Sequence, residues 1–82
     1  MIPEEARAAV DAVVAAYERG DPGAARLRLH PYLHWISADG TTTRGRTNVL
    51  TMLTARSLAG EPLAAPDAVE LRDAQLYRWR ST

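Results

Sequence analysis

The sequence predicts an α+β fold for this chain. The first observation is a helical spacing of apolar residues near the N-terminus. The second is a pair of segments rich in aromatic and β-branched residues, each interrupted by a turn signal. The third is their order, helix, helix, hairpin, helix, hairpin, which is typical of segregated α+β folds. With 82 residues and no internal repeat, we expect one domain over residues 1–82.

The first helix is predicted over residues 3–19. Pro3 suits the first helical turn, where its missing N–H is not needed. Glu4 and Glu5 then lie at the positive end of the helix dipole. The apolar face of this helix is predicted to contain Ala6, Val10, Val13, Val14 and Tyr17.

A short second helix and a hairpin are predicted next. The helix covers residues 22–29 and ends at His30-Pro31, because proline disfavours helical backbone in the residue before it. Residues 32–37 have the composition of a strand. Asp39-Gly40 is a hairpin signal, and the threonines of residues 41–45 suit the returning strand.

A third helix and a second hairpin complete the prediction. Thr47 is the predicted N-cap of a helix over residues 48–58, in which Leu50, Leu53, Thr54 and Ser57 share one face. A turn-rich connector follows. Residues 68–80 then predict a hairpin with its turn at Asp73-Ala74.

The alternation of side chains along a strand assigns the residues of both hairpins to faces. In the first hairpin, Leu33, Trp35 and Ser37 are predicted on one face, and Tyr32, His34 and Ile36 on the other. In the second, Tyr77 and Trp79 are predicted to share a face with Val69 and Leu71, opposite Leu76, Arg78 and Arg80.

An ordered series of segments resembles the SnoaL-like branch of the nuclear transport factor 2-like superfamily. They are "YERGD", "HPYLHWISADG", "RGRTNVLTML" and "VELRDAQLYRWR". The resemblance implies a cone in which three helices pack on the concave face of a curved antiparallel sheet. Because one hairpin alone follows the third predicted helix, the domain is expected to be truncated relative to that family.

The resemblance also bears on catalysis. In ketosteroid isomerase-like members an aspartate before the first hairpin turn is the general base. Ser37 occupies that position here, and a serine cannot take a proton unaided at neutral pH. The catalytic residues are therefore unassigned, and we expect a non-catalytic small-molecule-binding module or a dimeric accessory or interaction module. The alternative is a cyclase, isomerase or hydrolase acting on a hydrophobic polycyclic or polyketide-like substrate.

A ligand pocket is expected inside the cone. Trp35 either lines this pocket or fills the core, and core is the more common role for a tryptophan in so small a domain. Arg46 precedes the third helix and is a candidate anion contact, although a surface ion pair is the simpler explanation. The predicted ligand-binding residues are Tyr17, Trp35, Ser37, Arg46, Tyr77 and Trp79.

Composition and charge limit the classes of partner. The formal net charge is zero, and without a basic block we expect no nucleic-acid surface. No cysteine is present, and Pro31 prevents His30 and His34 from forming a helical metal pair, so no metal or cofactor is expected. No apolar run of about 20 residues is present, so we expect no membrane partner and a cytoplasmic location. A sheet with few strands leaves open edges, which favours a homodimer formed through the sheet.

Overall fold

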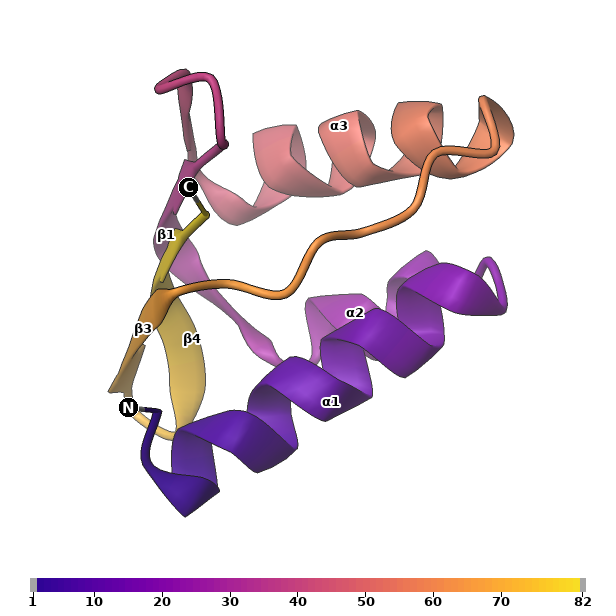
Figure 1. Cartoon of the computed structure of the whole chain (residues 1–82). Helices are drawn as coiled ribbons and strands as arrows, with labels where there is room; N and C mark the ends of the chain where they lie inside the picture. Colours follow the sequence, from indigo (N-terminus) through magenta and orange to yellow (C-terminus); the bar gives the residue numbers. More distant parts are fainter. Residues whose placement is uncertain (1, 82) are drawn as a thin grey trace.

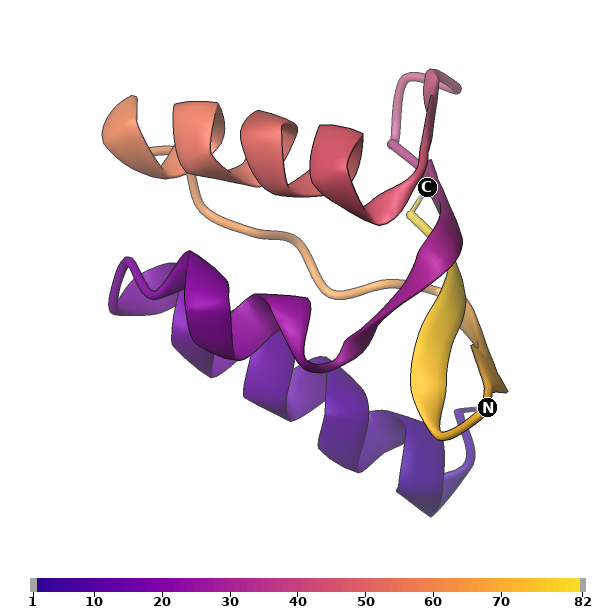
Figure 2. The same cartoon turned by 180° about the vertical axis from the view of Figure 1, so that it is seen from behind.

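A computed structural model describes residues 2–81, so the first and last positions of the predicted domain lie outside the described residues. Three helices lie on one side of a four-stranded sheet (Figure 1), and the opposite view shows no helix on the other side (Figure 2). The α+β prediction is therefore confirmed. The elements are α1 (Glu4–Glu18), α2 (Pro22–Arg26), β1 (Leu29–Ile36), β2 (Thr42–Arg44), α3 (Arg46–Leu58), β3 (Ala68–Arg72) and β4 (Gln75–Arg80).

The helices begin close to where the sequence predicts them, but two of their ends differ. Asp21 caps α2 by accepting a hydrogen bond from the backbone N–H of Ala24 at 3.1 Å. The prediction that α2 extends to residue 29 and ends at His30-Pro31 is wrong. Leu29 pairs with Leu76 of β4, so β1 begins at Leu29, and His30 and Pro31 lie within this strand. Likewise α3 begins at Arg46, so Thr47 is not its N-cap.

The sheet is mixed, with strand order β2-β1-β4-β3. Both hairpins are antiparallel as predicted, but the central strands β1 and β4 run parallel. The prediction of a wholly antiparallel sheet is therefore wrong. The physical reason is that α3 and the connector after it carry the chain back, so that β4 enters beside β1 in the same direction.

A β-bulge in β4 changes which side chains face the helices. Glu70 pairs with Arg78, whereas the next residue of β3, Leu71, pairs with Leu76. Two residues of β4, Tyr77 and Arg78, therefore oppose a single residue of β3. The predicted faces of Trp79, Arg78 and Arg80 are confirmed, whereas those of Leu76 and Tyr77 are wrong because of the bulge. Leu76 and Trp79 are buried on the helix side, and Tyr77 lies with Arg78 on the other side.

The core lies between the sheet and the helices. Strand β1 presents Leu33 and Trp35 to it, and Ser37 just after the strand lies on the same side, as the alternation predicts; β4 adds Leu76 and Trp79. The helices contribute small and branched side chains, which let them approach the two indole rings closely. These helix residues are Ala9, Val10, Val13, Val49 and Leu53. Within the described residues, no helix has the length and apolar character needed to cross a membrane.

Candidate functional site

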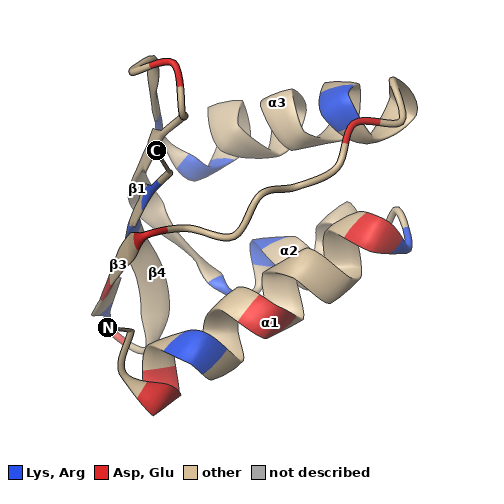
Figure 3. Cartoon of the chain, in the orientation of Figure 1, with Lys and Arg blue, Asp and Glu red and all other residues tan. Residues whose placement is uncertain are grey.

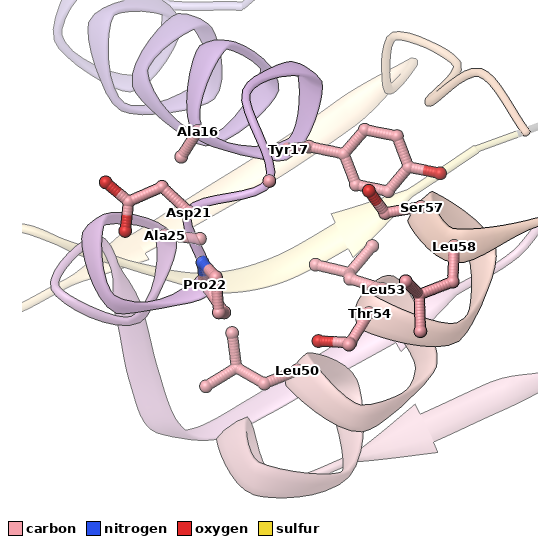
Figure 4. Close-up of a pocket in the computed structure, with 11 residues that line it drawn as sticks. Ala16, Tyr17, Asp21, Pro22, Ala25, Leu50, Leu53, Thr54, Ser57 and Leu58 are labelled. Atoms are coloured by element: carbon pink, nitrogen blue, oxygen red, sulfur yellow. The ribbon is translucent and has the colours of Figure 1, made fainter. Parts of the chain in front are cut away.

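The candidate site is an apolar pocket of about 110 Å³ between the three helices. It lies toward the ends of α1 and α3 that point away from the sheet (Figure 1), and Figure 4 shows the side chains that line it. The walls are mainly hydrocarbon, with the hydroxyl groups of Thr54 and Ser57 on one side. The walls include Ala16 and Tyr17 of α1, Pro22 and Ala25 of α2, and Leu50 and Leu53 of α3.

The local sequence explains how the walls meet. Gly20 adopts φ +67°, a left-handed conformation that a residue without Cβ reaches easily, and it ends α1. Asp21 and Pro22 then start α2 at once, so the chain folds back against α1. The small side chains of Ala16 and Ala25 leave space between these helices and α3. Leu58 borders the opening and is 85% exposed.

Tyr17 closes the pocket toward the connector after α3. Its phenol donates a 2.5 Å hydrogen bond to the backbone carbonyl oxygen of Glu61, 44 residues away in the sequence. Burial raises the pKa of the Tyr17 phenol, and the negative charge of Glu61 raises it further, while Arg56 acts in the opposite direction. The phenol therefore stays protonated at neutral pH, where it serves as a hydrogen-bond donor and not as a base.

The two tryptophans fill the core and do not line the pocket. Trp35 is 1% exposed and Trp79 is 0% exposed. Their rings stack with centroids 4.3 Å apart and planes 9° from parallel. The indole Nε1–H of Trp79 donates to the hydroxyl of Ser81 at 3.2 Å. Of the two roles that the sequence left open for Trp35, the structure assigns the core.

The remaining predicted ligand-binding residues lie apart from the pocket. Ser37 is buried on the helix side of β1, where its hydroxyl accepts a 3.3 Å hydrogen bond from Arg56. Arg46 is the first residue of α3, whereas the pocket uses the later turns of that helix. Tyr77 lies on the face of the sheet that the helices leave open. Of the six predicted residues, Tyr17 is the one that lines the pocket.

His30 is the most enclosed titratable group of the sheet. Its Nδ1 accepts a hydrogen bond from the backbone N–H of Tyr32 at 3.1 Å, and its Nε2 lies 3.6 Å from Oδ2 of Asp73. Both ring nitrogens of His30 therefore already have a partner within the chain. The described residues contain no group of three or more histidine, aspartate or glutamate side chains placed to hold a metal ion.

Sequence reasoning missed the α2 wall of the pocket. The shared face of Leu50, Leu53, Thr54 and Ser57 was visible in the helical spacing, and it now faces the pocket. What the sequence did not reveal is that Pro22 and Ala25 lie opposite it.

Comparisons of this chain with family models, with curated proteins and with solved structures find no match.

Proposed function

We propose that this protein is a non-catalytic module that binds a small apolar molecule between α1, α2 and α3. The observation that carries the proposal is the apolar pocket with hydroxyl groups on one side only. Ligand sites are typically concave and mostly apolar, with a few polar groups that fix orientation. The hydroxyl groups of Thr54 and Ser57 would orient a carbonyl or hydroxyl oxygen of the ligand.

The size of the pocket limits the ligand. A cavity of about 150 Å³ holds one benzene molecule, so a pocket of about 110 Å³ suits one ring or a short branched chain that projects from the opening. A polycyclic substrate would need the space that Trp35 and Trp79 occupy. The enzyme alternative also needs an acid or base in the pocket. Asp21 is the carboxylate at its wall, and it is held by the backbone N–H of Ala24 and by Arg19.

A titration with small probes tests the proposal. Indole and cyclohexanol would be added to isotopically labelled protein, and amide chemical shifts would be followed for Ala16, Ala25 and Leu53. We expect saturable shifts for one-ring probes and none for a four-ring steroid. Absence of saturable shifts in these residues would refute the pocket as a ligand site.

A matched pair of variants makes the test specific. Ser57→Leu places a larger side chain into the pocket, whereas Ala15→Leu adds the same side chain on an exposed position of α1. We expect the first to weaken indole binding about tenfold or more, and the second to leave it unchanged. Equal effects would show that the probes bind elsewhere.

We further propose that the chain is a shortened SnoaL-like domain with a cone-like arrangement and a cytoplasmic location. Support comes from the order helix, helix, hairpin, helix, hairpin and from the position of all three helices on one side of the sheet. Residual dipolar couplings of the strand amides would test the cone, since a flat sheet would contradict it. Fluorescence microscopy of a tagged chain in its native cell would test the location.

A homodimer formed through the sheet remains part of the proposal. The edge strands β2 and β3 each pair with one neighbour and leave the other side open. Pairing of two β3 strands would extend the sheet across the dimer. Sedimentation equilibrium over a wide concentration range would test this, and a purely monomeric mass at the highest concentration would contradict it.

A further inference from the structure

The arginines of the strands lie together on the face of the sheet opposite the helices. The strands contain four arginines but a single acidic residue, Glu70. Figure 3 shows basic residues on the strands and several acidic residues on α1. The zero net charge of the chain therefore averages over surfaces that differ in charge. We call the face formed by Tyr32, His34, Tyr77, Arg44, Arg72, Arg78 and Arg80, together with the single carboxylate of Glu70, the open face.

The strand register places these side chains side by side. His34 pairs with Arg44 on one side and with Arg78 on the other, and Glu70 follows beyond Arg78, so one row holds two arginines and one carboxylate. In the next row Ile36 pairs with Arg80. Since the neighbours of His34 and Ile36 along β1 are buried, both rows project away from the helices. Partners in neighbouring strands lie about 5 Å apart.

Aromatic rings are interleaved with these guanidinium groups. The β-bulge brings Tyr77 to the same face as Arg78. The guanidinium carbon of Arg72 lies 4.3 Å from the centre of the Tyr77 ring, and the His34 ring is 5.7 Å from it. Tyr32 is 73% exposed, which is unusual for so large a ring on a strand. The open face thus offers flat rings and positive charge within a few ångströms of each other.

Among the described residues the arginines of the open face form no ion pair, although Glu70 is the register neighbour of Arg78 and Arg72 lies over the Tyr77 ring. Among residues 2–81 the ion pairs are Arg19 with Asp21 and His30 with Asp73, and neither involves an arginine of the sheet. A second copy of the chain would be a poor occupant, because a two-fold contact would place this cluster of arginines against itself. An acidic peptide would match the charge but would give the exposed rings no flat partner.

We propose that the open face binds single-stranded nucleic acid. Such ligands combine a phosphate backbone, which guanidinium groups neutralise, with unpaired bases, which stack on tyrosine and histidine rings. A duplex hides its base faces and would lose the stacking. Four strands at about 4.8 Å spacing give a platform roughly 15 Å wide. Its four arginines could neutralise about three or four phosphates. This inference uses the face opposite the proposed ligand pocket, and each can fail without the other.

Fluorescence anisotropy with a labelled oligo-dT of about 12 nucleotides tests the proposal. Neutralisation of three or four phosphates predicts that the logarithm of the association constant falls with the logarithm of salt concentration with a slope of about −2 to −3. We expect weak, saturable binding that is stronger for single strands than for a duplex of the same length. No saturable binding at low salt would overturn the proposal, and so would equal binding of the duplex.

Variants separate the contributions of charge and stacking. Arg78→Gln should weaken binding about tenfold and reduce the salt slope by about one. Tyr32→Ala should weaken binding at least fivefold with the slope unchanged, because stacking carries no charge. Arg7→Gln removes the same charge from an exposed position of α1 and should leave binding unchanged. If all three variants bind equally, or if oligoglutamate competes as well as oligo-dT, the open face is not a nucleic-acid site. Circular dichroism confirms that each variant is folded.

Discussion

The stacked tryptophans provide the sharpest test of how the core is built. A double-mutant cycle with Trp35→Leu and Trp79→Leu measures the free energy that couples the two rings. Replacing a buried tryptophan by alanine costs about 3–5 kcal/mol. Leucine retains part of the apolar volume, so we expect each single variant to lose about 2 kcal/mol. A domain of this size has roughly 4–12 kcal/mol of stability, so both single variants should fold.

The coupling follows from the geometry of the pair. Aromatic pairs contribute about 0.5–1.5 kcal/mol beyond the area they bury. The 4.3 Å centroid separation lies just below the usual range of about 4.5–7 Å, so the two rings are in close contact. The double variant should therefore be less destabilised than the sum of the single variants by about 1 kcal/mol. Urea unfolding followed by far-ultraviolet circular dichroism gives the free energies of unfolding. Additivity within about 0.3 kcal/mol would refute the stacked arrangement.

Three further predictions concern the β3–β4 hairpin and Tyr17. Ala74 adopts φ +63°, a conformation that costs a non-glycine residue about 1 kcal/mol, so Ala74→Gly should raise the free energy of unfolding in urea by about that amount. The β-bulge predicts that Leu76→Ala costs about 2–5 kcal/mol, whereas Arg78→Ala costs under about 0.5 kcal/mol; similar losses in thermal unfolding would contradict the observed faces. Because the pKa of the Tyr17 phenol is raised in the folded state, its contribution to stability is fully present below the unfolded pKa near 10 and is lost as pH rises toward the folded pKa. Tyr17→Phe should therefore lose less stability between about pH 9 and pH 11 than the unmodified chain in urea titrations, and an identical pH profile would contradict the pKa direction.

Local patterns in the sequence account for most of the secondary structure. The apolar spacing and the proline at the start of α1 both act within a few turns of helix, and the structure has that helix over Glu4–Glu18. Asp39-Gly40 and Asp73-Ala74 likewise locate both hairpin turns, since the backbone of a tight turn depends on the few residues within it. Where a distant strand competes with a local preference, the prediction fails. His30-Pro31 is typical of a helix end but lies in β1, because the residues on both sides of it, Leu29 and His34, pair with β4.

The sequence by itself determined the α+β class, the two hairpins and the burial of the Trp35 side of β1, because each depends on periodicity within one segment. Tertiary structure alone decided the parallel pairing of β1 with β4, the β-bulge at Tyr77 and the pocket between α2 and α3. It also decided that scattered arginines meet on the open face. These features depend on which segments come together in space, and the free energy of such contacts is shared by residues far apart in the chain. The sequence pattern of one segment does not identify the segment that packs against it in the fold.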